Sequence, residues 1–364
     1  MEGPSPPAAR CRSTVRSRLA PRTVRAAQRA WAMAVACLAS ALLAGATQAE
    51  NASSYYAGKT LKVIVGFSPG GGYDTYARMV ARHIGRHIPG NPAVVVQNMA
   101  GAGSLRAVLF LDSVALDDST VLVTFNSGLI TDALTSPERL KVDFRKFAWI
   151  GNVSEDVRVC YMWHTSGVRN WQDMLARDKV VFGATSPGTA GYVEGVMLRE
   201  LFGVKLKLIQ GYPGSADKRL AIEKAEVQGD CGGWISIPEE WLRERKIAVL
   251  VRLSSTLLPG MDANVPFARD LLQDEADRRI YDFLMAPERL GRLFMASGRV
   301  PADRVAMLRA AFDAMVADPA FVSEAQRMRL PVAPMSGDEV SRHVAEIYAT
   351  PAALVARAKT MMGE

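Results

Sequence analysis

The sequence predicts an α/β fold with mostly parallel sheets, and three observations support this prediction. Strand signals alternate with helix signals along the chain. Each early strand runs into a turn rich in Gly, Ser or Asn, and the ligands of open α/β sheets bind at such turns. A glycine turn joins a strand to a helix at Pro69–Asp74, and a second one does so at Ala184–Gly191. Two such turns predict two α/β units, each supplying one wall of a cleft.

Residues 1–49 have the pattern of a secretory signal, which predicts export to the periplasm. Seven arginines and one glutamate precede an apolar, alanine-rich run from Trp31 to Ala44, and small residues follow at Thr47–Ala49. The run is shorter than the about 20 residues that a membrane span needs, but an uncleaved anchor stays an alternative. The basic region is also long, so a true start further along the chain stays open.

The charge of the chain is concentrated in this first segment. The whole sequence has a formal charge of +7, and the seven arginines and one glutamate of residues 1–49 account for +6 of it. The remaining 315 residues therefore carry about +1 and have no basic patch with interleaved aromatic residues, which argues against nucleic-acid binding. Their number is sufficient for two domains of ordinary size.

The strands of the first unit are short apolar runs, and those of the second unit follow a transition at Phe147–Val153. The first run is rich in β-branched residues, as a buried strand should be. Strands are predicted at Leu61–Phe67, Ala93–Gln97, Thr120–Phe125, Val157–Trp163, Val180–Ala184, Leu206–Gln210, Val227–Asp230 and Lys246–Arg252. The segment Leu258–Pro266 then interrupts the pattern with Pro and Gly.

The helices are predicted from apolar residues at helical spacing and from capping residues. Asp74 or Thr75 is a natural N-cap for the first helix, whose apolar positions are Ala77, Val80, Ala81 and Ile84. Further helices are predicted at Leu105–Ala115, Trp171–Ala176, Tyr192–Phe202 and Ala216–Lys224, and in the tail from Pro301, where Val305, Leu308, Phe312, Met315 and Val316 share one face and Val340, Val344 and Ile347 another.

The turn Pro69–Asp74 predicts an anion site. Its glycines let the backbone approach a bound group, and the N-terminus of the following helix offers unpaired N–H groups and the positive end of the helix dipole. The histidines lack metal-site spacing and no nucleotide-binding motif fits, so neither a metal nor a cofactor is expected. Cys160 and Cys231 remain after the signal, either as a disulfide or as two separate buried thiols.

A series of short motifs lies along nearly all of residues 50–364. They are Lys59–Asp74 with a Pro-Gly-Gly-x-x-Asp loop, Val94–Asn98, Gly101–Gly103, Asp143–Phe144, Ser186–Thr189, Gly211–Ser215, Leu290–Phe294 and Pro301. Through these motifs and their order, the chain resembles the solute receptors of tripartite tricarboxylate transporters, the Bug or TctC-like family. The chain departs from the family pattern at Tyr192–Val193, Gln210–Gly214 and Asp230–Trp234, which concern the second wall of the cleft.

The resemblance implies a periplasmic binding protein with two lobes, a type II-like Venus flytrap, that is not an enzyme. Lobe 1 would comprise residues 57–152 plus 293–364, and lobe 2 residues 153–292. The family implies a small organic acid of the di- or tricarboxylate class as ligand, membrane permease subunits of a tripartite tricarboxylate transporter as partners, and a monomer. An orphan receptor that feeds a sensor kinase is the alternative function.

The expected ligand-binding residues come from the loops of both lobes, and most of them would donate backbone N–H groups. They are Phe67, Ser68, Gly70, Gly71, Gly72, Asp74, Asn126, Ser127, Thr185, Ser186, Gly188, Thr189, Tyr212 and Trp234. For Asp74 a role in capping the helix is expected over direct ligand contact, because a carboxylate would repel an acid. Tyr212 and Trp234 are candidates for the floor of the cleft, with core packing as the other reading.

The segment Gly66–Gly70 also matches the G-x-S-x-G motif of α/β-hydrolases, which makes Ser68 a candidate nucleophile. In that motif the residue after the serine donates its N–H to the oxyanion hole. Here this residue is Pro69, which has no N–H. A secreted hydrolase is therefore a remote alternative.

Overall fold

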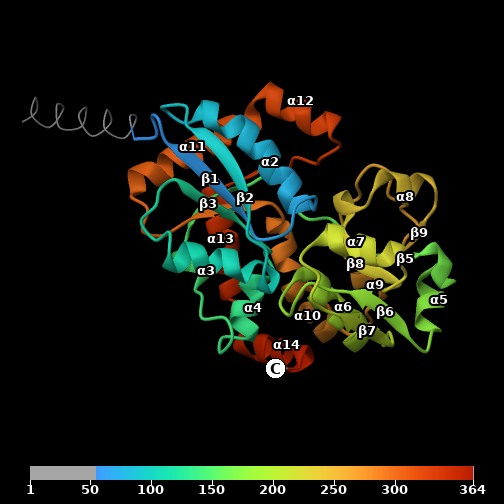
Figure 1. Cartoon of the computed structure of the whole chain (residues 1–364). Coiled ribbons are helices and arrows are strands. Elements are labelled where there is room, and N and C mark those ends of the chain that lie inside the picture. Colours follow the sequence, from blue (N-terminus) through green and yellow to red (C-terminus); the bar gives the residue numbers. More distant parts are fainter. Residues whose placement is uncertain (1–54, 364) are drawn as a thin grey trace, which may run out of the picture. The chain divides into compact units, whose positions relative to one another are not determined.

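Two mixed β-sheets with helices on their faces form the described part of the chain, which is residues 55–363 of the computed structural model (Figure 1). The predicted signal at residues 1–49 lies outside the described residues. Helices and sheets together confirm the predicted α/β class.

The first sheet has the strand order β11-β4-β10-β3-β1-β2, and the second has the order β7-β6-β8-β5-β9. The strands of the first sheet are β1 (Thr60–Val65), β2 (Ala93–Asn98), β3 (Val121–Thr124), β4 (Ala148–Asn152), β10 (Leu293–Ala296) and β11 (Met335–Ser336). Those of the second are β5 (Arg158–Trp163), β6 (Val180–Gly183), β7 (Leu206–Ile209), β8 (Gly229–Gly233) and β9 (Ile247–Arg252).

Both sheets are mixed, so the expected parallel pairing holds for only part of each sheet; in the second sheet, β6 is parallel to β7 and to β8. In the first sheet β1 pairs in parallel with β2 and β3, but β4, β10 and β11 pair antiparallel. In the second sheet β5 is antiparallel to both β8 and β9. The reason is topological: β10 and β11 enter the first sheet after the whole second sheet has been completed, and local sequence patterns do not encode the direction of such a return.

The helices that follow the glycine turns are the ones that concern the site, and Figure 1 labels most of the helices. The helices are α2 (Gly72–Ile84), α3 (Leu105–Ser113), α4 (Leu129–Thr135), α5 (Trp171–Leu175), α6 (Ala190–Glu200), α7 (Ser215–Glu223), α8 (Glu239–Arg243), α9 (Ala268–Leu271), α10 (Glu275–Met285), α11 (Ala302–Ala317), α12 (Pro319–Arg327), α13 (Gly337–Tyr348) and α14 (Ala352–Met362). Short 3₁₀ turns include η6 (Ala286–Leu290). The sequence analysis did not foresee α4 or α10. No helix within residues 55–363 is long and apolar enough to span a membrane.

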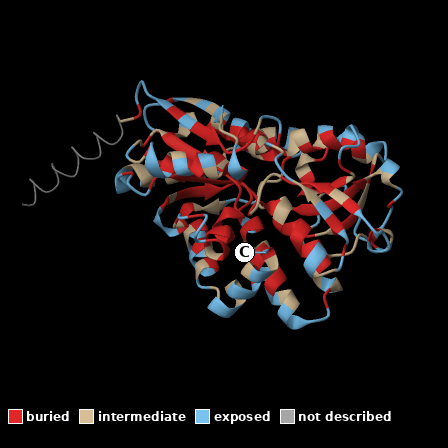
Figure 2. Ribbon diagram, turned by 60° about the horizontal axis from the view of Figure 1, so that its bottom comes forward, coloured by how far each residue is buried: buried red, intermediate tan, exposed pale blue. Residues whose placement is uncertain are grey.

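The strand β1 shows why the first sheet needs helices on both faces. Leu61, Val63 and Val65 belong to one apolar cluster, with residues of α2, α11 and α12. Ile64 points into another cluster, which also takes residues from the second sheet. Both faces of β1 are therefore buried, which explains its nearly continuous apolar run. In Figure 2 the buried residues follow the strands and the inner faces of the helices.

The chain passes between the two sheets along two segments that are bonded to each other. The N–H of Val153, after β4, donates to the carbonyl of Arg292 at 3.0 Å. The N–H of Asp156 donates to the carbonyl of Glu288 at 2.8 Å. Since these pairs join the segment after β4 to the segment before β10, both passages lie side by side. The lobe boundaries at residues 152 and 293 stay a prediction.

A disulfide joins the two central antiparallel strands of the second sheet. Cys160 of β5 lies opposite Cys231 of β8, and both are buried. The alternative of two separate thiols therefore does not hold in this structure. The bridge fixes the two strands next to the residues that form one wall of the candidate site.

Candidate functional site

The glycine turn after β1 is held in shape by Asp74. The Gly70 N–H donates to Asp74 Oδ2 at 2.9 Å, and Asn98 Nδ2 donates to Asp74 Oδ1 at 2.9 Å. Arg78, one helical turn along α2, pairs with the same carboxylate at 2.9 Å. Burial would raise the pKa of Asp74, but these donors, Arg78 first, outweigh burial and hold the pKa below its usual value. Asp74 thus stays ionised and orders the turn.

Three helices begin at the candidate site, and each begins without a side-chain cap from the described residues. The N-cap residues are Gly71 for α2, Thr189 for α6 and Gly214 for α7. A helix leaves its first N–H groups without intrahelical partners, and a capping side chain normally accepts one of them. Helices α5, α10, α12 and α13 have such caps, from Asn170, Asp274, Asp318 and Ser336, whereas α3, α4, α8, α9, α11 and α14 lack one as the helices at the site do. What sets the three helices at the site apart is that they begin at one place, where their first N–H donors are left for a shared acceptor.

These helix starts surround a cavity of about 40 Å³ that both sheets help to line. Its lining residues are Phe67, Gly71, Gly72, Tyr73 and Asn126 from the first-sheet side, and Arg158, Thr185, Thr189, Ala190, Gly191, Ser215 and Lys218 from the second-sheet side. A volume of this size holds about one to three water molecules. A small diacid would therefore enter only if the walls move apart.

Hydrogen bonds close one end of the cavity by tying the glycine turn to the start of α7. Ser68 Oγ donates to Asp217 Oδ2 at 2.6 Å, and the Ser68 N–H donates to the carbonyl of Pro213 at 3.4 Å. Arg219 donates to the carbonyl of Gly70 at 3.2 Å. These three bonds hold the two walls together in the conformation described here.

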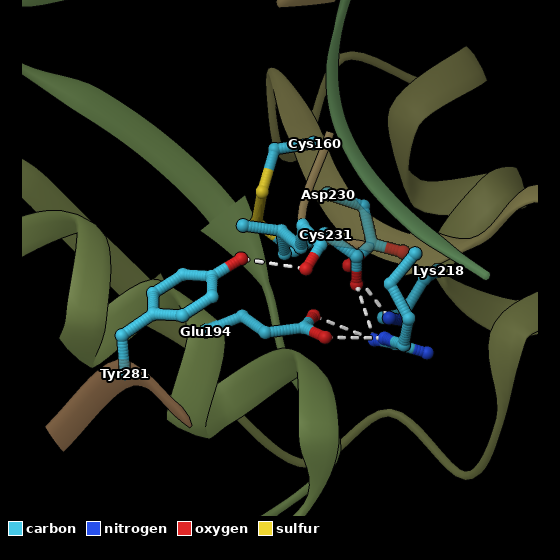
Figure 3. Close-up of a disulfide and its surroundings, with 8 residues drawn as sticks. Cys160, Glu194, Lys218, Asp230, Cys231 and Tyr281 are labelled. Carbon is cyan, nitrogen blue, oxygen red and sulfur yellow. Dashed lines mark hydrogen bonds and ion pairs between the residues drawn. A yellow bond between two sulfur atoms is a disulfide. The ribbon is translucent and has the colours of Figure 1, made fainter. Parts of the chain in front are cut away.

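The second-sheet wall contains a buried cluster of charges. Arg158 forms a two-pronged ion pair with Glu194, with 2.6 Å between Nη2 and Oε2, and also contacts Asp156 at 3.0 Å. Lys218 Nζ lies 2.6 Å from Asp230 Oδ1. Figure 3 shows the side chains of Glu194, Asp230 and Lys218 drawn together below the disulfide. The wall is therefore ionic, with each cation paired.

Asp156 links this cluster to the passages between the sheets. Its Oδ1 accepts from Arg292 at 2.7 Å, while its Oδ2 faces Arg158. Burial would raise the pKa of Asp156, but the two arginines, Arg292 first, outweigh burial and lower it. The guanidinium of Arg292 also lies 4.7 Å from the centre of the Tyr73 ring, at the start of α2. The cluster thus reaches the first-sheet wall.

The charges of the cluster nearly cancel. Three cations, Arg158, Lys218 and Arg292, face four carboxyl groups. Burial raises the pKa of Glu288 well above its usual value, and Arg158 only partly opposes this. Burial likewise raises the pKa of Asp230, with Lys218 as the main opposing charge. Both carboxyl groups therefore favour the neutral form more than a solvated carboxyl group does.

Three buried hydroxyl groups close to the cavity have no hydrogen-bond partner within residues 55–363. They belong to Tyr73, Ser127 and Ser186. A buried hydroxyl without a partner is costly, so each indicates a water molecule or a ligand in the occupied site. All three can donate to an anion.

Comparison with known proteins identifies the fold, through solved structures. No model of a protein family matches the sequence, and no curated protein matches it. Among solved structures, the periplasmic binding protein BugD matches with a TM-score of 0.67 and 19% identity over 83% of this chain and 98% of BugD. MatC of Rhodopseudomonas palustris with bound malate matches with a TM-score of 0.66 and 17% identity over 84% of this chain and 99% of MatC. The R. palustris protein Rpa4515 with adipate matches with a TM-score of 0.64 and 16% identity over 83% of this chain and 98% of Rpa4515.

This chain has the fold of the periplasmic solute-binding proteins. The expected two-lobed architecture is confirmed, and so is the resemblance to the Bug and TctC-like proteins at the level of fold.

Of the expected site residues, six line the cavity: Phe67, Gly71, Gly72, Asn126, Thr185 and Thr189. Ser68, Gly70 and Asp74 instead shape or fasten the glycine turn. Gly188 has a positive φ of 76°, and a side chain there would overlap the Asp132 carboxylate, so this glycine serves the close approach of the two walls. Ser127 and Ser186 belong to the group of unpartnered hydroxyls described above.

Tyr212 and Trp234 do not line the cavity. Trp234 is buried in an apolar cluster with Tyr161 and Trp241, and it borders a different depression of about 310 Å³. Tyr212 packs over Gly183, where a methyl group would lie 3.3 Å from its ring. Of the two roles expected for these aromatic residues, packing is the one that the structure shows.

Sequence reasoning missed the charged residues of the second wall, Arg158 and Lys218, and also Tyr73 and Ser215. A signal for Arg158 was present, because it is the one charged residue within the otherwise apolar run Val157–Trp163. The signal for Lys218 was weak, since a lysine in a helix is usually solvated.

The geometry around Ser68 does not form a hydrolase triad. Its hydroxyl donates to Asp217, a carboxylate, and none of the histidines in the described residues contacts it. His83 is bonded to Glu324 at 2.5 Å, His87 to Asp318 at 3.0 Å and His343 to the carbonyl of Ala286 at 3.0 Å. Ser68 therefore lacks the imidazole base that a serine nucleophile requires.

Proposed function

We propose that this protein is a periplasmic receptor that binds a small organic acid between its two sheets and passes it to a tripartite tricarboxylate-type permease. The observation that carries the proposal is the meeting of three uncapped helix N-termini with Arg158 and Lys218 at one cavity. Unpaired N–H groups, helix dipoles and cations all favour an anion.

Binding would proceed through an opening and closing of the two walls. In the closed form the donors of both walls act together in a site that excludes water, which strengthens each of them. The acid would insert while the contacts of Ser68 with Asp217 and Pro213 are broken, and closure would follow around it. Nothing in this cycle alters the solute chemically. The malate in MatC and the adipate in Rpa4515 support an acid as the kind of solute.

A thermal-shift panel on the purified protein tests the ligand class. Mono-, di- and tricarboxylic acids are compared with the corresponding neutral amides. An acid present at about one hundred times its Kd should stabilise the protein by about 2.7 kcal/mol, while its amide should leave the Tm unchanged. Calorimetric titration then gives the Kd. Equal shifts for acids and amides, or recovery of a converted solute by mass spectrometry, would contradict the proposal.

A glycine variant tests the position of the site. A methyl group on Gly71 would lie 3.8 Å from Ser215, so the backbone accommodates Gly71→Val while the added branches enter the cavity. We expect this variant to keep its Tm without ligand and to lose binding. Ala57→Val, at an exposed residue before β1, is the matched control and should bind as the wild type does.

The permease partner and the periplasmic location rest on the family resemblance. Sequencing the N-terminus of the protein recovered from the periplasm would locate the cleavage expected near residue 49. Solute uptake by membrane vesicles that contain a tripartite permease should depend on added receptor. Uptake that does not depend on it, together with a solute-dependent response of a sensor kinase, would favour the alternative role as an orphan sensor.

A further inference from the structure

The two cations of the second wall converge on the start of α6. Gly191, in the first turn of this helix, lines the cavity together with Arg158 and Lys218. A methyl group placed on Gly191 would meet the carbonyl oxygen of Cys231 at 2.9 Å, with Lys218 Nζ at 3.5 Å and Arg158 Nη2 at 3.7 Å. An acidic group on the cavity side of the N-terminus of α6 would therefore lie close to the helix N–H groups and to both cations. This point is where the second wall would hold an anion.

Both cations, however, already have buried carboxylate partners. Lys218 and Asp230 lie 2.6 Å apart, with side chains 6% and 3% exposed. Arg158 is engaged by Glu194 and Asp156. A bound acid would therefore add a negative charge to a cluster in which each cation already has a carboxylate partner, in a buried place where excess charge is costly.

We propose that a bound acid shares Lys218 with Asp230 and that Asp230 takes up one proton from solvent as the acid binds. This inference rests on the proposed function and deepens it, because it makes the receptor one that binds an acid together with a proton. The physical basis is that two carboxylates competing for one cation at short range cannot both stay ionised at little cost.

Among the four carboxyl groups of the cluster, Asp230 is the one suited to this role. Asp156 lies between two arginines, and Glu194 holds Arg158 with both oxygens. Glu288 lies 3.9 Å from Arg158 and makes no ion pair with Lys218 among the described residues. Asp230 has a single cation in hydrogen-bond contact, and that cation is the one that lines the cavity.

The groups around Asp230 agree with this assignment. Lys218 and Arg219 face it from α7, Arg158 and Tyr161 from β5, and Glu194 from α6. Burial, and then the charge of Asp230, raise the pKa of Tyr161 well above its usual value, so Tyr161 stays neutral. Burial also raises the pKa of Asp230 itself, and the acid would raise it further. Proton uptake implies tighter binding at lower pH.

Calorimetry with malate, adipate and citrate as probes tests the inference. Each acid is titrated at about pH 7, where it is itself almost fully ionised, in two buffers with different ionisation enthalpies. For the wild type we expect the measured enthalpy to differ between the buffers by an amount that corresponds to about one proton taken up. The Kd should fall by up to about tenfold for each unit decrease in pH near neutrality.

Three variants test whether Asp230 is the group that takes up the proton, and they separate this uptake from misfolding and from general changes in binding. Asp230→Asn should remove the buffer dependence and tighten binding at about pH 7.5 by about tenfold, because Lys218 is then left to the acid alone. The double variant Lys218→Gln with Asp230→Asn leaves no unpaired charge, so it guards against misfolding of the single variant; it should bind more weakly and also without proton uptake. Asp178→Asn, in the exposed pair with Lys205, is the matched control and should behave as the wild type.

The outcomes distinguish this inference from the proposed function. Binding of an acid without buffer dependence, or proton uptake that persists in Asp230→Asn, overturns the inference and leaves the receptor function standing. If none of the three acids binds the wild type, the proposed acid class fails and the inference fails with it.

Discussion

The two walls of the cavity are built on different physical principles. The first-sheet wall presents backbone N–H groups and hydroxyls, and the carboxylate of Asp74 is turned back to hold the glycine turn. The second-sheet wall adds Arg158 and Lys218, whose charges are balanced by buried carboxylates from three other elements. A neutral wall of dipoles keeps its properties across a wide range of pH, whereas an ionic wall responds to protons and depends on every partner being present. If the proposed function is right, the cavity would bind its anion between a wall that is insensitive to pH and a wall that titrates.

The largest expected effect comes from breaking the ionic wall. Asp156→Asn leaves Arg158 and Arg292 facing each other without their shared carboxylate, although both are buried. Removing one member of a buried ion cluster typically costs about 3–5 kcal/mol. Denaturation by urea should show this loss in the free energy of unfolding. Asp178→Asn, in an exposed pair, is the control and should have little effect; a similar small effect for Asp156→Asn would mean that the cluster does not stabilise the wall.

The next largest loss of stability is expected from removing the disulfide Cys160–Cys231 of the second sheet. The disulfide closes a loop with a sequence separation of 71 residues. Replacing both cysteines by serine should cost about 2–4 kcal/mol. Calorimetric melts of the double variant and of the reduced wild type should give similar losses. Since Arg158 and Asp230 each stand close to a bridged cysteine, the affinity for the acid should fall as well, and an unchanged Kd would show that the bridge does not position the wall.

A smaller loss of stability is expected from replacing Asp74 in the neutral wall. The size of this loss should depend on pH in a direction that follows from the pKa of Asp74. Asp74→Asn weakens the bonds to Gly70, Asn98 and Arg78 and should cost about 1–2 kcal/mol near neutral pH. Because the folded pKa of Asp74 is lowered, its contribution is complete above about pH 4 and is lost as the pH falls further. Urea melts of wild type and variant should therefore converge in acid.

The contribution of Asp230 to the free energy of unfolding should change with pH in the direction opposite to that of Asp74, which sharpens the contrast between the walls. Its folded pKa is raised, so its ionised form costs stability that is regained as the pH falls from that raised value towards about 4. Relative to the wild type, Asp230→Asn should therefore gain stability as the pH rises through this window. The same trend in Asp74→Asn and Asp230→Asn would contradict the distinction between the walls.

The smallest change in free energy is expected from a variant at the contact between the two walls. Ser68→Ala removes the donor to Asp217 and should cost about 0.5–1.5 kcal/mol of the closed form. The unfolding free energy should change little, but small-angle scattering without ligand should show a larger mean radius. An unchanged radius would indicate that other contacts suffice to close the cavity.

The neutral wall could be predicted from the sequence because its parts are neighbours in the chain. The turn after β1, Asp74 and the start of α2 lie within one short segment. The same strand-turn-helix pattern predicted Thr185–Thr189 on the second-sheet wall. The ion cluster of that second wall could not be predicted in this way. Asp156 and Arg292 are 136 residues apart, and Arg158 and Glu194 are 36 apart, so only the folded sheet brings them together.

Trp234 is a residue for which the sequence left two roles open, the floor of the cleft and core packing. It follows β8 directly. After Gly233 its ring instead packs among Tyr161 and Trp241. A sequence pattern places a residue at the end of a strand, but the side of the sheet on which a large ring is buried depends on which neighbours leave space for it.

The contact between Ser68 and Asp217 also offers a way to make occupancy visible. A solute larger than the present cavity has to separate these side chains, so their surroundings would change from dry to wet with each capture. An environment-sensitive dye attached at the start of α7 would report that change as a difference in emission, and the receptor would then serve as an optical sensor for its own solute.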